Sequence, residues 1–313
     1  MKKILIILGA SSLILLLFTH PGTAASGCSL GLRLWYTAVL PSLLPFLIFS
    51  NLMVATGLFR CLTPVCAPLL KGLFGISDDS CYSVLLGFLC GFPMGAKVVA
   101  DLVREGHISP EEGSYLLGFC NNVSPAFFLN YICLTKLGYA SVPWLLVLLF
   151  YALPLIYGMI TRPFYHFHIQ SAEKKQASLH RLDFPMLDAC MMDAFSTITR
   201  LGGYIILFTI LVQFLMLLPL PPFPLAFLSI LMEISCGIDQ ITALTALSPL
   251  SRTALVCTGA ALGGLCICAQ TQSVLSGTPL RVGTWLKGRI TIAVLVFLLV
   301  QLAAAAPALR GCW

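Results

Sequence analysis

The sequence predicts an all-α integral membrane protein with two inverted-topology halves, each holding a re-entrant helical hairpin and a broken transmembrane helix. Hydrophobic residues make up 58% of the 313 residues and charged residues only 10%, whereas about a quarter of a soluble domain is charged. Apolar segments of near-spanning length recur along the chain. Two of them are interrupted in the middle, at residues 91–95 and 121–125.

These two interruptions mark the segment in which we expect a ligand site. Proline inside a helix removes a backbone hydrogen bond and clashes with the preceding turn. Non-helical backbone persists at membrane depth only where protein or a watery cavity surrounds it. Paired broken helices are therefore the best pointer in a sequence to the binding site of a transporter.

A spanning helix needs about 20 mostly apolar residues. Candidate segments are 34–58, 82–103, 112–134, 139–161, 201–218, 223–247, 252–275 and 285–306. The N-terminal residues 1–26 combine Lys2, Lys3, an apolar run and a small-residue stretch. This pattern is typical of a cleaved secretory signal and equally of a short first membrane helix, and both interpretations stay open.

Loop charge orients the segments, because basic loops remain on the cytoplasmic side. The polar loop 162–183 should therefore be cytoplasmic, as should the segment that carries Arg281, Lys287 and Arg289. If every candidate crossed the bilayer, the loop at 162–183 would lie outside. The conflict disappears if 82–103 enters from the cytoplasm and turns back at 91–95. By the same reasoning 223–247 is a hairpin that enters from outside.

Each half then contains three full crossings, and this odd number gives the halves opposite orientation. We expect an N-terminal segment at 1–26, a first repeat at 27–161, a cytoplasmic loop with an interfacial helix at 162–200, and a second, inverted repeat at 201–313. The interfacial helix is predicted at 185–200, where apolar residues form one stripe and aspartates fall largely off it.

Lys97 is the first candidate site residue, in the first turn after the break formed by Gly91, Pro93 and Gly95. An ionisable residue at this depth rarely lacks a role or a partner. It pairs with Asp101 at i+4, or it faces an anionic ligand while Asp101 tunes it. The start of the half-helix also offers free N–H groups and a positive dipole end.

Asn121, Asn122, Ser124 and Pro125 form the second break. Amides donate and accept hydrogen bonds, so they can recognise a carboxylate, a ring nitrogen or a sugar hydroxyl. Alternatively, the amides only satisfy the backbone that the proline frees. We favour a ligand role, because two adjacent amides exceed what one kink needs.

The second half offers a matching set: Glu233, Ser235, Gly237, Gly264 and Gln270. Glu233 is the acid of the second hairpin, and either binds a coupling ion or proton or pairs with a basic residue of the first hairpin. Ser235 and Gly237 are expected to form its break. Gly264 and Gln270 occupy the place that matches the asparagine pair, although small residues also let helices approach without any ligand.

Other function classes lack support in the sequence. The 13 cysteines include no C-x-x-C pair and mostly lie in apolar runs, where cysteine behaves as a small hydrophobe. Hydrolase and Walker A motifs are absent, so we expect no catalysis, cofactor, metal site or ATP drive. The net charge of +6 is spread over loops and does not indicate nucleic acid. A homo-oligomer is left open.

Two motifs, GFPMGAK at 91–97 and FCNNVSP at 119–125, together with LMEISCG at 231–237, resemble the sporulation integral membrane protein YlbJ family. That family belongs to the larger group with the nucleoside recognition or Gate domain. The resemblance covers most of the chain. It implies a spore-forming bacterium, and a carrier in the outer forespore membrane that moves dipicolinic acid, a small dicarboxylate. The Gate domain is also similar to parts of concentrative nucleoside carriers.

The sequence thus predicts a transporter in the cell membrane or outer forespore membrane, working by alternating access with an anionic ligand between the hairpin tips and the unwound helices. One alternative is a carrier of nucleosides or other small metabolites, since a neutral nucleoside does not need Lys97. A second is a non-transporting membrane scaffold in spore maturation, for which Lys97→Ala and Asn121→Ala would leave function intact.

Overall fold

The computed structural model describes residues 2–167 and 183–305, and these residues form helices joined by short connections. Within them, five helices are long and apolar enough to cross a bilayer, or six if one bent pair counts as a span. The five are Pro21–Thr56, Trp144–Phe164, Phe184–Leu215, Pro249–Val274 and Val282–Leu302. The chain is an all-helical integral membrane protein, as predicted.

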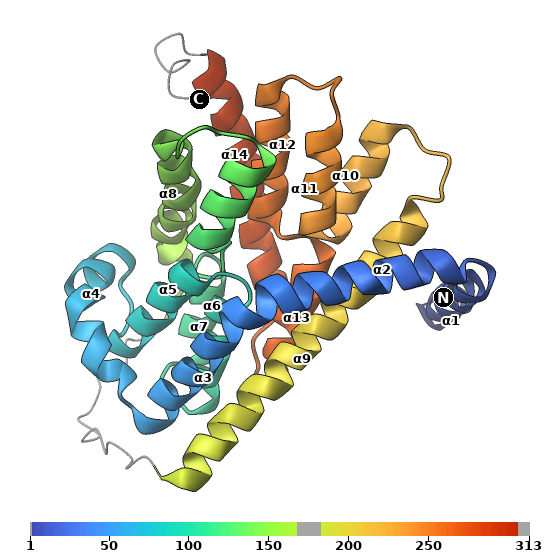
Figure 1. The fold of residues 1–313 in the computed structure, drawn as a ribbon. Coiled ribbons are helices and arrows are strands. Elements are labelled where there is room, and N and C mark those ends of the chain that lie inside the picture. The colour runs from blue at the N-terminus through green and yellow to red at the C-terminus, as the bar shows by residue number, and fades with distance from the viewer. Residues whose placement is uncertain (1, 168–182, 306–313) are drawn as a thin grey trace.

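Figure 1 shows the order of the elements. They are α1 (Lys2–Thr19), α2 (Pro21–Leu34), the π-helical stretch η1 (Trp35–Val39), α3 (Leu40–Thr56), α4 (Phe59–Phe74), α5 (Asp78–Cys90), α6 (Met94–Arg104), α7 (Pro110–Leu117), the π-helical stretch η2 (Phe127–Lys136), α8 (Trp144–Thr161), the short η3 (Arg162–Phe164), α9 (Phe184–Leu215), α10 (Pro222–Met232), α11 (Ile234–Ala243), α12 (Pro249–Leu262), α13 (Gly264–Val274) and α14 (Val282–Ala305).

The first span begins at Pro21 rather than at residue 34, because α2, η1 and α3 form one continuous apolar helix. Proline suits the start of a helix, where its missing N–H is not needed. Gly27 and Gly31 let α2 lie close against α9. The two helices cross in Figure 1. A Cβ on Gly27 would lie 2.7 Å from the Cα of Ile210, and Thr209 donates to the Gly27 carbonyl at 2.9 Å.

The helix predicted at 185–200 does not end before the next predicted span, because α9 runs unbroken for 32 residues. The Gly202–Gly203 pair does not interrupt it. A Cβ on Gly202 would lie 2.6 Å from the indole nitrogen of Trp35, and that nitrogen donates to the Ile198 carbonyl at 2.9 Å. Packing against the first span therefore outweighs the low helix propensity of glycine. Residues 168–182 of the predicted cytoplasmic loop lie outside the described residues.

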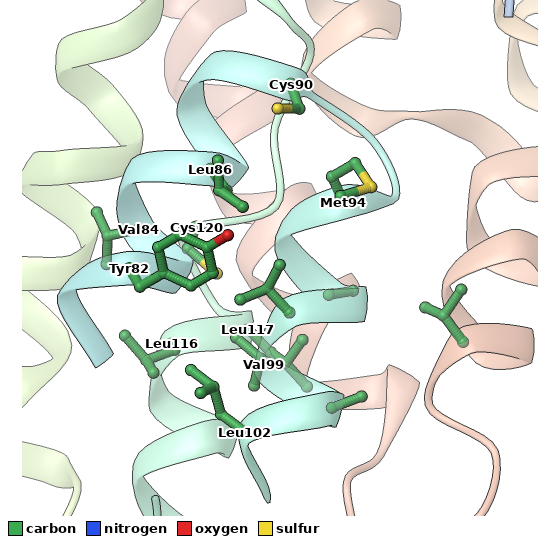
Figure 2. Close-up of a cluster of buried hydrophobic side chains, with 14 of the residues drawn as sticks. Tyr82, Val84, Leu86, Cys90, Met94, Val99, Leu102, Leu116, Leu117 and Cys120 are labelled. Atoms are coloured by element: carbon green, nitrogen blue, oxygen red, sulfur yellow. The ribbon is translucent and has the colours of Figure 1, made fainter. Parts of the chain in front are cut away.

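Two helical hairpins occur where the sequence predicts them. In the first, α5 and α6 are joined at residues 91–93 and lie side by side (Figure 2). In the second, α10 and α11 meet at Glu233. The four arms have 13, 11, 11 and 10 residues. Each arm is well short of the roughly 20 residues that a crossing needs.

The second hairpin breaks about one turn earlier than its predicted position at Ser235 and Gly237. Glu233 has an extended backbone, and its Oε2 accepts from the backbone N–H of Cys236 at 2.8 Å. This side chain therefore caps α11 and fixes its start. Gly237 lies inside α11, where it lets the backbone of Ile230 on α10 come close.

Both predicted helix breaks are also present. After α7, residues 118–124 are unwound and the helix resumes at Pro125. The counterpart break separates α12 from α13 at Gly263 and Gly264, whose φ angles are +87° and +72°. Only glycine adopts such angles without strain, so the glycine pair explains why this helix breaks here.

Candidate substrate site between the broken helices

Three glycines on the first hairpin, Gly87, Gly91 and Gly95, form what we call the glycine seat. A Cβ on Gly95 would lie 2.6 Å from the carbonyl oxygen of Cys120, and one on Gly91 would lie 2.5 Å from the nitrogen of Ser124. Gly87 faces the same Cys120 carbonyl. Gly91 and Gly95 thus admit the unwound backbone of residues 118–124. The four-residue glycine spacing is the signal that identifies Gly87.

We expect Gly95→Val to destabilise the folded protein by about 1–3 kcal/mol or more, because the added carbons meet backbone that cannot move aside. The measurement is the fraction of monodisperse protein in detergent after stepwise heating. Gly203→Val is the matched control, since nothing lies within 4 Å of a Cβ at Gly203. Equal melting of the two variants would contradict the close contact at the glycine seat.

Four carbonyls of the unwound segment accept hydrogen bonds from side chains, because buried backbone groups need partners. Two helices and the segment itself supply the donors. Tyr151 of α8 donates to the Val123 carbonyl at 3.0 Å, and the Asn122 amide donates to the Phe119 carbonyl at 2.7 Å. From α14, Trp285 donates to the Asn121 carbonyl at 3.4 Å and Arg289 to the Gly118 carbonyl at 3.5 Å. The break is therefore a fixed part of the fold.

The two asparagine amides are occupied within the protein. Asn121 accepts from the N–H of Ala96 at 3.3 Å and donates to Thr271 of α13 at 3.3 Å. The Asn122 side-chain oxygen accepts from Arg289 at 2.6 Å. Both asparagines are fully buried. This geometry favours the alternative in which the amides support the backbone. The Asn121 side-chain oxygen also occupies the Ala96 N–H in the first turn of α6.

Arg289 is the site residue that sequence reasoning missed. The sequence assigned it only to a basic cytoplasmic segment, whereas the structure buries it on α14, where it is 1% exposed. Gly288 beside it lets α14 approach the Gly118 carbonyl. Among the described residues no carboxylate pairs with Arg289, and its Nε has no hydrogen-bond partner. An arginine inside a 24-residue apolar helix was the available signal.

Lys97 has partners of its own. Its ammonium donates to Asp101 at 2.7 Å, to Asp193 of α9 at 2.9 Å and to Asn51 of α3 at 3.2 Å. These contacts use all three ammonium protons. The predicted i+4 pair with Asp101 is therefore present, and a second carboxylate joins it from α9. The arrangement leaves Lys97 without a free proton for an anionic ligand.

Lys97 lines a polar cavity of about 460 Å³ that we call the polar vestibule. Its charged lining is balanced, with three basic and three acidic side chains: Lys97, Arg104, Arg200, Asp101, Glu105 and Asp193. The vestibule lies among α3, α6, α9 and the end of α13.

A second cavity, of about 300 Å³, lies where the four interruptions meet, and we call it the central cavity. Each interrupted element contributes lining residues: Phe92 from the first hairpin tip, Val123 and Ser124 from the unwound segment, Glu233 and Ser235 from the second hairpin, and Ile267 and Gln270 from α13. The first span covers it from Leu34 to Phe46. The predicted convergence of the breaks is therefore present.

The predicted site residues divide into three groups. Ser124, Glu233, Ser235 and Gln270 line the central cavity, and Lys97 lines the polar vestibule. Asn121 and Asn122 hold the unwound backbone. Four of the remaining residues lie at the breaks: Gly91, Pro93, Pro125 and Gly264. Gly95 and Gly237 lie inside α6 and α11, where each admits the backbone of a neighbouring segment.

The central cavity is mainly apolar, with a few polar groups, which is the usual composition of a small-molecule site. Glu233 is the one charged side chain in its described lining, and it is 5% exposed. Tyr131, Ser124, Ser235 and Gln270 add neutral hydrogen-bonding groups. Because no basic side chain lines it there, an anion in this cavity needs a proton or cation beside Glu233.

The sequence comparisons agree with this picture at the level of family. The chain is 26% identical to the Bacillus subtilis sporulation integral membrane protein YlbJ over 320 aligned positions, which cover 91% of this chain and 78% of YlbJ. No family model matches the chain, and no solved structure matches it. Together with the membrane-spanning helices described above, this similarity supports the YlbJ family of sporulation integral membrane proteins.

Proposed function

We propose that this sporulation membrane protein is a carrier that moves a small molecule across the bilayer by alternating access, with the central cavity as its substrate site. The observation that carries the proposal is the meeting of four interrupted segments at one cavity. Broken helices are costly in a bilayer, and transporters use them to place binding groups at mid-membrane.

The hairpins are re-entrant in this proposal, and the two halves are inverted repeats. The shortness of the four arms supports it, since none spans a bilayer alone. Loop charge supports the orientation: the end of the molecule that holds α4, the end of α6 and the end of α8 carries Arg60, Lys71, Arg104 and Arg162. This end faces the cytoplasm under the positive-inside rule.

Dipicolinic acid is the first substrate to test, with the outer forespore membrane as the site of action. The motifs shared with the YlbJ family support this choice. The cavity admits such a dicarboxylate only with its charge compensated, because Glu233 is acidic. We therefore propose that a proton or other coupling cation binds at Glu233 together with the substrate.

The test is the dipicolinate content of spores from Bacillus subtilis cells that lack YlbJ and express this chain. We expect the unaltered chain to restore dipicolinate, and Ser235→Trp to abolish the gain because the indole fills the central cavity. Ser196→Trp, at an exposed position of α9, is the matched control. Membrane levels of each variant are measured alongside.

A failure of the unaltered chain to restore dipicolinate would rule out this substrate. Normal dipicolinate with Ser235→Trp would rule out passage through the central cavity and favour the scaffold alternative.

A neutral nucleoside is the second candidate, favoured by the lack of a basic side chain in the described lining of the central cavity. Its base would stack near Phe92 and Phe127, and Gln270 and Ser124 would hydrogen-bond to its polar edge. Thermal shifts of the purified protein with uridine and with dipicolinate separate the two candidates, because only the true substrate should raise the melting temperature, by the mass-action term.

A further inference from the structure

The two cavities follow each other along the same helices. On α9, Leu201 lines the polar vestibule, and Ile205 lines the central cavity one turn later. On α13, Val274 lines the vestibule and Gln270 the central cavity. Residues four apart lie on the same face of a helix. The vestibule and the central cavity are therefore consecutive spaces along one side of both helices.

The Lys97 cluster stands beside this passage and joins its walls. Lys97 connects α6 to Asp193 of α9 at 2.9 Å and to Asn51 of α3 at 3.2 Å. Asn51 in turn donates to Asp193 at 3.0 Å. Arg104, also on α6, donates to the Val274 carbonyl at the end of α13. The second arm of the first hairpin is thus tied to three other elements at the vestibule.

We propose that the contact between Lys97 and Asp193 is a gate between the polar vestibule and the central cavity, so that Lys97 controls access rather than binding substrate. The inference builds on the proposed carrier function. Breaking the contact frees α6 from α9, and the glycine seat then lets the hairpin tip move along the unwound segment. Because all three ammonium protons are used, the cluster is complete in the closed arrangement.

The second hairpin has a separate tie at the opposite end of the molecule, where Figure 1 shows α11 extending away from α6. Asp239 of α11 pairs with Lys136 at 2.7 Å and accepts from Tyr131 at 2.9 Å. This tie joins the second hairpin to η2 of the first half. It supplies a control for the experiment, because breaking it should not open the path from the vestibule.

Native cysteines report on each space. Cys190 lines the polar vestibule and Cys90 lines the central cavity, with exposures of 8% and 7%. Membrane vesicles are treated from either side with a membrane-impermeant methanethiosulfonate, and modification of each cysteine is followed by mass spectrometry. We expect Cys190 to react from the vestibule side in the unaltered protein while Cys90 stays protected.

In Lys97→Gln and in Asp193→Asn, the rate at which the reagent modifies Cys90 from the vestibule side should rise about tenfold or more. This is the change expected for the loss of one charge-assisted hydrogen bond. The charge-swapped pair Lys97→Asp with Asp193→Lys should restore protection. Lys136→Gln and Lys71→Gln, the latter removing an exposed ion pair to Asp78, should leave the vestibule-side rate unchanged.

Two results would overturn the gate. One is continued protection of Cys90 in both single variants while Cys190 still reacts. The other is equal labelling of Cys90 from both sides, which shows loss of structure instead of opening. The experiment needs no substrate, so its outcome is independent of the dipicolinate test.

Discussion

Replacing Arg289 with methionine should lower the free energy of unfolding by about 3–5 kcal/mol, the largest stability effect we expect for a single side chain in this protein. The change leaves the Asn122 amide oxygen and the Gly118 carbonyl without their donors. Each buried acceptor left unsatisfied costs about 1–3 kcal/mol. Poor recovery of monodisperse protein from detergent-solubilised membranes, with early melting of what remains, is the expected result.

Arg289→Lys tests the reason for this effect. Lysine keeps the charge but cannot reproduce the planar fork that reaches two acceptors, so its melting temperature should fall between those of the unaltered protein and Arg289→Met. Lys287→Gln, on the exposed side of the same helix, should melt like the unaltered protein. A normal melting temperature for Arg289→Met would show that the unwound segment does not depend on Arg289.

Glu233→Gln should reduce dipicolinate in spores about tenfold or more, equivalent to at least about 1.4 kcal/mol of lost binding or coupling. The glutamine oxygen still caps α11, as the carboxylate does through the Cys236 N–H, so the protein should fold and insert. What disappears is the negative charge that holds a proton or cation beside the substrate. Spore dipicolinate, normalised to the amount of protein in the membrane, is the measurement.

Glu111→Gln is the control for this second change, because it removes one carboxylate at an exposed position outside both cavities. We expect it to leave dipicolinate unchanged. Full accumulation with Glu233→Gln would exclude a charge-coupled role for this residue. It would leave the neutral-substrate alternative as the better explanation of the central cavity.

Local signals in the sequence predicted the interruptions well. The motifs at 91–95 and 121–125 break their helices because glycine and proline act through their own backbone geometry. Contacts between distant segments were not predictable in this way. Arg289 meets Asn122 across 167 positions and Lys97 meets Asp193 across 96, and no local pattern encodes either pair. The continuity of α9 likewise depends on Trp35, far away in the sequence.

The glycine seat has a further consequence for how the first hairpin can travel. Helices that interlock through side chains resist sliding, and they shift in jumps of about one turn, or 5.4 Å, from one set of grooves to the next. Gly87, Gly91 and Gly95 have no side chains to interlock with the unwound segment. We therefore expect the first hairpin to shift by small distances along residues 118–124 without side chains that would have to pass one another.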